Sequence, residues 1–159
     1  MRKAIFGLLL MGMLIICSCH KAPPSAPGGS WTFKGISYTA TSCIGNDSIF
    51  YLTATDSTAS GFAGSVTVAF YSTLPVNNGT YTVVYGSSPN QPTQVAIITT
   101  IGSSVGGLNY QSTSGNGNQT VRVSVSNGEI SLTGSGIEMV NTSNASDSAA
   151  LSLSITQLQ

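Results

Sequence analysis

The stretch VRVSVSNGEISLTG, residues 121–134, decides the fold class of this chain. Three valines alternate with polar residues before the Asn127–Gly128 pair, and apolar residues alternate again after it. Alternation with a period of two is typical of a half-buried antiparallel strand. An Asn-Gly pair favours a type I′ turn, because both central positions of that turn need a positive φ. The stretch therefore predicts a β-hairpin that joins residues 119–125 to residues 129–133.

The same alternation recurs along the chain. Residues 66–71 and 151–156 each place apolar side chains on one face and polar side chains on the other. No stretch has the i, i+3, i+4 spacing of an amphipathic helix. Further strands are expected at residues 31–34, 36–43, 48–55, 80–85 and 94–101, which are rich in β-branched and aromatic residues.

About eight to ten short strands without helices predict one all-β domain, a single antiparallel β-sandwich. A small β-barrel is the alternative, because it also consists of short strands and frequent turns. The segment Gly102–Asn118 is rich in glycine and serine, and we expect it to be a mobile loop, the longest irregular piece of the domain.

The N-terminus has the pattern of an export signal. Arg2 and Lys3 precede an uncharged, mostly apolar run over residues 4–16. This run is shorter than the ~20 residues that a membrane-spanning helix needs. It ends in Ile-Cys-Ser-Cys, and the aliphatic residue three positions before Cys19 resembles a lipobox. We therefore expect a cleaved signal peptide over residues 1–18 and a lipid on Cys19. An ordinary signal peptide without lipid is the alternative.

A tether and one domain are expected to follow the signal. Acyl chains on Cys19 would anchor the protein stably in a lipid bilayer. Residues 20–30 read HKAPPSAPGGS, a composition that cannot pack, so residues 19–30 are predicted to be a flexible tether. The all-β domain is then expected to occupy residues 31–159.

Charged residues make up only 6% of the 159 residues. After cleavage the chain would keep three basic residues, Lys21, Lys34 and Arg122. Neutralising many phosphates demands a positive stripe, which three scattered cations cannot form. The composition therefore argues against nucleic acid as a partner.

Few residues could support catalysis or metal binding. The only histidine, His20, lies beside the lipidated Cys19, so histidine-dependent nucleophilic triads and His/Cys metal sites are not expected. Cys43 is the one cysteine within the domain, and we expect it to be buried as a small apolar residue. No cofactor motif is present, because the glycines of residues 103–110 precede neither a helix nor a lysine.

A hydrolase that uses paired carboxylates is a third-ranked alternative. Aspartates in turns and at strand starts usually accept backbone hydrogen bonds, and Glu138 is the acid that the pattern explains least. The five candidate acids are Asp47, Asp56, Glu129, Glu138 and Asp147.

The sequence offers more candidate residues for binding than for catalysis. Tyr51 and Tyr71 fall on the polar faces of their expected strands, and Tyr110 lies in the expected long loop. Exposed aromatic rings among Ser, Thr and Asn could stack on sugar rings and form a ligand face. Cross-strand aromatic pairs also stabilise sheets, so a purely structural role for these rings is the alternative.

The lipobox, the Pro-rich tether, the WTFKGISYTATS opening and the VRVSVSNGEISLTG hairpin together resemble small lipoproteins of the Bacteroidota. Those are compact β-domains of unassigned function, so the resemblance implies a fold and a location and no catalytic residue. The expected location is the outer membrane. In Bacteroidota, lipoproteins exported to the cell surface typically carry acidic residues shortly after the lipidated cysteine. Cys19 is followed by none, so the resemblance implies that the domain faces the periplasm, with the cell surface as the alternative.

All three aspartates are followed by serine, at Ser48, Ser57 and Ser148. Each triplet resembles the acceptor signal for protein O-glycosylation in Bacteroidota. Asp-Ser is also a favoured turn and strand-entry pair, which is the simpler explanation.

These observations together predict a non-enzymatic envelope lipoprotein. Its β-domain is expected to bind a glycan, a peptide or another envelope protein. A structural component of the envelope, assembled through exposed sheet edges, is the alternative.

Overall fold

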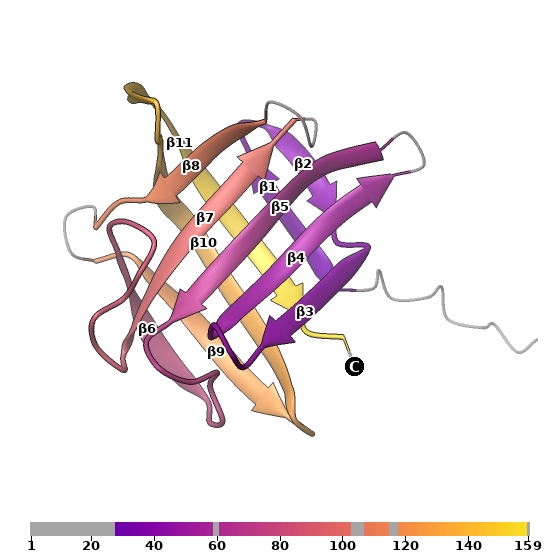
Figure 1. Cartoon of the computed structure of the whole chain (residues 1–159), viewed down its shortest axis with the longest axis vertical. Helices are drawn as coiled ribbons and strands as arrows, with labels where there is room; N and C mark the ends of the chain where they lie inside the picture. Colours follow the sequence, from indigo (N-terminus) through magenta and orange to yellow (C-terminus); the bar gives the residue numbers. More distant parts are fainter. Residues whose placement is uncertain (1–27, 59–60, 103–106, 115–117, 159) are drawn as a thin grey trace, which may run out of the picture.

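The computed structural model describes residues 28–58, 61–102, 107–114 and 118–158, and these contain eleven β-strands and no helix (Figure 1). The predicted all-β class is confirmed. The residues predicted to form the signal peptide, Cys19 and nearly all of the predicted tether lie outside the described residues. In chain order the strands are β1 (Gly29–Phe33), β2 (Ile36–Thr39), β3 (Ser42–Asn46), β4 (Tyr51–Thr58), β5 (Gly61–Phe70), β6 (Gly79–Val84), β7 (Gln94–Ile101), β8 (Leu108–Ser112), β9 (Thr120–Ser126), β10 (Glu129–Asn141) and β11 (Asn144–Thr156).

Five of the strands form a closed ring. The hydrogen-bonded order runs β10–β9–β6–β7, and β8 pairs with both β7 and β10, which closes the circuit. Closure removes the exposed edges that an open sheet would leave. The ring corresponds to the barrel that the sequence offered as an alternative to the sandwich, with further strands on both sides of it.

Two groups of strands extend from the ring. β11, β1 and β2 continue outward from β10, and β5, β4 and β3 continue outward from β7. The chain passes from one group to the other between β2 and β3, where Ala40 N–H donates to Gly29 O (2.9 Å) and Thr41 N–H donates to Thr55 O (2.8 Å). The segment expected as one strand over residues 36–43 is therefore divided at a corner.

The predicted hairpin is confirmed. Asn127 and Gly128 have φ values of 54° and 82°, as a type I′ turn requires. The register pairs Ser126 with Glu129 and Arg122 with Thr133. β10 then continues beyond the predicted end of the hairpin, through a bulge between Gly134 and Ile137.

Two expectations about the sheet are wrong. One pair, β6 with β7, is parallel, because residues 85–93 carry the chain back to the start of β6 instead of making a tight turn. The segment Gly102–Asn118 contains strand β8 and is not a continuous loop. The sequence conceals this strand because its buried side chains, Tyr110 and Ser112, are polar. Ser112 Oγ accepts from Ile97 N–H (2.9 Å) and donates to Val84 O (2.7 Å), so hydrogen bonds compensate its burial.

The core fills the space inside the strands with alternating apolar side chains. Trp31 stacks on Tyr38 with a centroid distance of 5.1 Å, and Phe33 meets Tyr110 edge to face at 4.8 Å. Cys43 is fully buried, as expected, and burial raises the pKa of its thiol to about 12. Such a thiol is a small core residue and not a nucleophile at neutral pH.

Candidate functional site

The three tyrosines named as a ligand face do not lie together on one face. Tyr110 is 0% exposed on β8, so its expected place in a mobile loop is wrong. Tyr71 is 46% exposed and lines a small hollow of about 200 Å³ with Tyr81. Tyr51 lies opposite Ala69 and is partly buried. A ligand contact by Tyr51 or Tyr71 therefore stays a prediction, and Tyr110 has another role.

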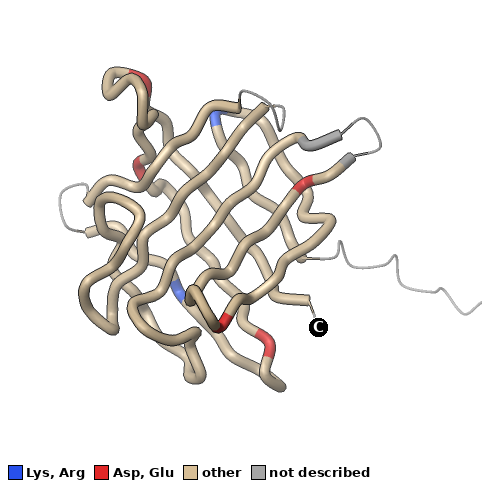
Figure 2. The backbone as a smooth tube through the Cα atoms, viewed as in Figure 1, with Lys and Arg blue, Asp and Glu red and all other residues tan. Residues whose placement is uncertain are grey.

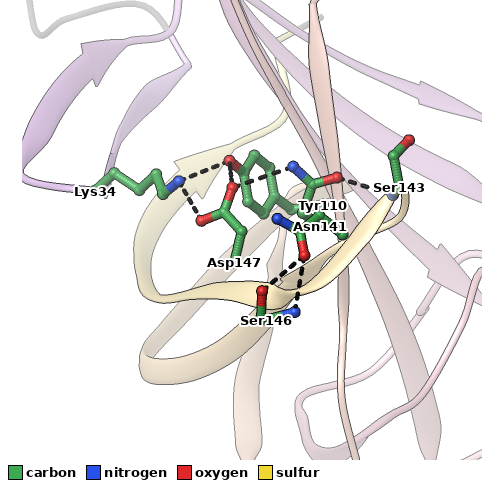
Figure 3. Close-up of polar contacts among 7 residues, drawn as sticks. Lys34, Tyr110, Asn141, Ser143, Ser146 and Asp147 are labelled. Carbon is green, nitrogen blue, oxygen red and sulfur yellow. Dashed lines mark hydrogen bonds and ion pairs between the residues drawn. The ribbon is translucent and has the colours of Figure 1, made fainter.

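Tyr110 belongs to a polar cluster at one end of the barrel, which we call the Lys34–Tyr110–Asp147 cluster (Figure 3). Lys34 Nζ donates to Tyr110 Oη (2.7 Å) and to Asp147 Oδ1 (2.5 Å). Tyr110 Oη donates in turn to Asp147 Oδ2 (2.7 Å). The three side chains come from the β1–β2 turn, from β8 and from β11, so the cluster joins three distant parts of the chain.

Asn141 completes the cluster. Its Nδ2 donates to Asp147 Oδ2 (3.1 Å), and its Oδ1 accepts from Ser143 N–H (2.9 Å). The hydrogen bond from Lys34, then those from Tyr110 and Asn141, lower the pKa of Asp147 from 3.8 to about 2. The same bond to Asp147 raises the pKa of Lys34. The two side chains are 31% and 28% exposed, and their charges are already matched within the chain.

A second polar region lies on the outer face of the sheet, which points away from the core. Directly opposed residues in neighbouring strands point to the same face of a sheet. The register therefore aligns six exposed side chains across β6, β9, β10, β11, β1 and β2, which we call the outer row. Its members are Thr80, Arg122, Thr133, Ser154, Ser30 and Thr39.

Three surface hollows lie along the outer row, with volumes of about 460, 560 and 200 Å³. Arg122 lines both the first and the second of them, while Gly134 and Ser154 line both the second and the third. Because neighbouring hollows share residues, they adjoin one another across the strands, and we call the three together the outer trough.

The bulge in β10 opens the middle of the trough. β9 pairs with β10 only as far as Arg122 and Thr133, and one extra residue is then inserted in β10 between Gly134 and Ile137. Gly136 has a φ of 66°, a conformation that favours glycine. Bulges of this kind are frequent beside functional sites, because they separate neighbouring strands locally.

Arg122 is the charged group of the trough. It makes no hydrogen bond or ion pair with any residue that the structure describes, whereas Lys34 forms the one ion pair found there. No Asp or Glu lines any of the three hollows. Figure 2 shows how sparse the charges are along the described part of the backbone. Among the described residues, the trough therefore presents hydroxyl groups, the amides of Asn78, Asn118 and Gln119, and one guanidinium without a described partner.

A different pair of hollows lies at the end of the barrel near the loop after β5. They have volumes of about 380 and 200 Å³ and share residues 73–76. Val76 is 79% exposed beside them, and Tyr71 lines the smaller one. These hollows share no lining residue with those of the outer trough.

The acids proposed for hydrolysis are dispersed among different elements. Asp56 is buried and accepts from Thr39 N–H (3.0 Å), Asp147 belongs to the cluster, and Glu138 accepts from Thr113 Oγ1 (3.2 Å). Among the described residues, no three His, Cys, Asp or Glu side chains are grouped as a metal site would require. The arrangement does not single out a pair of carboxylates.

The serines of the three Asp-Ser pairs are all exposed. Ser48 lies in the turn after β3, while Ser57 and Ser148 lie on β4 and β11. Exposure is necessary for modification but does not show it. O-glycosylation stays a prediction, which the intact mass of the protein from its native host would test.

No family model, curated protein or solved structure matches this chain. In the part of the chain that the structure describes, no helix has the length and apolar character to cross a membrane. The candidate site therefore depends on geometry alone. In the sequence Arg122 stands out only as one of three scattered basic residues, at a polar position of an alternating strand. The strand register that aligns six strands, which no local pattern reveals, gives it further significance.

Proposed function

We propose that this chain is an envelope lipoprotein whose β-domain is a non-enzymatic binding module for an extended, hydroxyl-rich ligand. The lipobox before Cys19 and the Pro-rich segment after it support anchoring in the outer membrane, with the domain towards the periplasm. The outer trough is the proposed binding surface.

The observation that carries the proposal is the continuity of the trough. The outer row presents a polar side chain on each of six successive strands, and the hollows along it share residues. Neighbouring strands are ~4.8 Å apart, so Thr80 and Ser30, four strand spacings apart, are separated by roughly 19 Å. A surface of this length suits a chain of linked units better than one small molecule.

The ligand class follows from the groups on the surface. Protein interfaces usually centre on buried aromatic or apolar anchors. The side chains of Leu153 and Val123, which line the hollows, belong to the core. Hydroxyl groups and backbone can exchange hydrogen bonds with a carbohydrate, directly or through water. A glycan is therefore the favoured ligand.

Blocking the trough tests the proposal. Ser154→Trp would place a large ring where two hollows meet, and Ser148→Trp provides a control on the same strand outside the trough. We expect the mature chain in detergent micelles to bind to glycans on an array. The Ser154→Trp variant should lose this binding, and the Ser148→Trp variant should keep it. Equal binding by all three proteins would refute the trough as the site.

The anchor is tested separately. Replacing Cys19 with Ala should move the protein from the membrane fraction to the soluble fraction of its native host and abolish labelling with radioactive palmitate. An unchanged distribution and unchanged labelling would contradict lipid attachment at this residue. Protease treatment of intact cells that removed the domain would place it on the cell surface instead.

A further inference from the structure

We propose that the glycan bound in the outer trough is acidic, and that Arg122 binds a singly charged anionic substituent of it. This inference depends on the proposed function, because it concerns the same surface. The shared chemistry is a monoanionic group, either a carboxylate or a sulfate ester. Arg122 would be the residue that distinguishes an acidic glycan from a neutral one.

The charge of Arg122 is available to a ligand. Lys34, the other basic residue that the structure describes, is bound to Asp147 and Tyr110, whereas Arg122 has no partner there. A guanidinium offers paired N–H donors whose spacing fits carboxylate and sulfate oxygens. No described residue therefore occupies the paired donors of Arg122.

The surroundings of Arg122 favour an anion. Its neighbours in the outer row are Thr80 on β6 and Thr133 on β10, both of which carry hydroxyl groups. No acidic residue lines the hollows on either side; the acid linked to this lining is Glu138, whose N–H donates to Gln119 Oε1. A neutral sugar unit could occupy the hydroxyl-lined hollows before and after the charged one.

The number of charges separates this ligand from other polyanions. Nucleic acid carries a phosphate on every unit, and its binding depends on neutralising several of them. A trough with one cation and many hydroxyl groups matches a polymer in which most of the contacts are uncharged. A glycan with anionic substituents fits this pattern.

Two matched pairs of polymers test the inference. Polygalacturonate methyl ester from which only a few ester groups have been removed is compared with the full methyl ester, and lightly sulfated dextran with dextran, because each pair differs mainly in a few charges. Binding to the full mature chain in detergent micelles is measured by isothermal titration calorimetry. We expect the acidic member of at least one pair to bind about tenfold more tightly, since a charge-assisted hydrogen bond contributes a difference of this order. The pair that responds identifies the carboxylate or the sulfate ester.

Three variants assign the preference to Arg122. Arg122→Gln should remove the preference for the acidic polymer, and Arg122→Lys should keep part of it, because lysine keeps the charge but loses the paired donors. Lys21→Gln makes the same change in net charge in the Pro-rich segment that precedes the domain in the sequence, and it should behave as the unchanged protein. Circular dichroism verifies that each variant keeps its β-structure.

The outcomes separate this inference from the proposed function. Equal binding of acidic and neutral polymers, unaffected by Arg122→Gln but abolished by Ser154→Trp, would overturn the acidic ligand and leave the trough in place. Binding that survives Ser154→Trp, or no binding to any polymer, would overturn both. An equal loss of acidic preference in Lys21→Gln and Arg122→Gln would assign it to net charge and overturn the role of Arg122.

Discussion

The two described basic residues occupy opposite situations. Lys34 lies in a cluster where Asp147 matches its charge and Tyr110 accepts a hydrogen bond from it, whereas Arg122 lies in a trough where no described side chain pairs with it. A matched charge uses its hydrogen-bonding capacity to hold distant segments together. An unmatched charge among hydroxyl groups keeps that capacity for a ligand. The difference supports the proposal that the cluster stabilises the fold and that the trough is a binding surface, and the following variants test this division.

The largest effect is expected from Tyr110→Ala. It removes a fully buried ring that packs against Phe33 and carries the hydroxyl of the cluster. Removing a buried aromatic side chain lowers the free energy of unfolding by about 3–5 kcal/mol. Chemical denaturation measures the loss. Tyr85→Ala, at a ring that is 62% exposed, is the matched control and should cost no more than about 0.5 kcal/mol. Equal losses would contradict a structural role for Tyr110.

A smaller effect is expected from Tyr110→Phe. The ring stays in the core, but Lys34 and Asp147 lose the hydroxyl that lies between them. Loss of such a hydrogen bond costs about 1 kcal/mol in the free energy of unfolding. Tyr71→Phe removes a hydroxyl that has no partner among the described residues, and it should be neutral. If both variants unfolded at the same denaturant concentration as the unchanged protein, the hydroxyl of Tyr110 would contribute nothing.

The cluster also predicts a pH dependence. The pKa of Asp147 is lower in the folded protein, about 2, than its ordinary value of 3.8. The contribution of the carboxylate is therefore complete above pH 4 and is lost as the pH falls from about 4 towards 2. Asp147→Asn should be less stable than the unchanged protein at pH 7, and the difference should shrink towards pH 2. Thermal unfolding across this range measures it, and a constant difference would exclude the linkage.

The smallest effect on stability is expected from Arg122→Gln. Arg122 is exposed and has no partner in the described structure, so the free energy of unfolding should change by no more than about 0.5 kcal/mol. The same variant should lose the preference for acidic polymers. A large decrease in the free energy of unfolding of Arg122→Gln would contradict the difference between Arg122 and Lys34, since both cations would then support the fold.

Much of the fold could be predicted because its signals are local. The alternation around Val121 and Val123 and the turn at Asn127–Gly128 depend on neighbouring residues, and the structure confirms both. Strand β8 could not be found in this way. Its buried residues, Tyr110 and Ser112, need hydrogen-bond partners from β1–β2, β6, β7 and β11, which no local pattern reveals.

The candidate site was harder to predict than the fold. The sequence named Tyr51, Tyr71 and Tyr110 from their chemistry, but burial removes Tyr110 from any surface. No local pattern in the sequence marks Arg122 as a residue of a site. Its importance comes from what lies opposite it, Thr80 on β6 and Thr133 on β10, and these residues are far from one another in the chain.

The sequence by itself determined the all-β class, the central hairpin and the burial of Cys43, because alternation and turn chemistry act over a few residues. It also carries the prediction of a lipid on Cys19, which is a local motif. Only the tertiary structure decided the closure of the ring through β8, the matched charge of Lys34 and the unmatched charge of Arg122. Those properties depend on strand register, which brings together residues that no spacing along the chain relates.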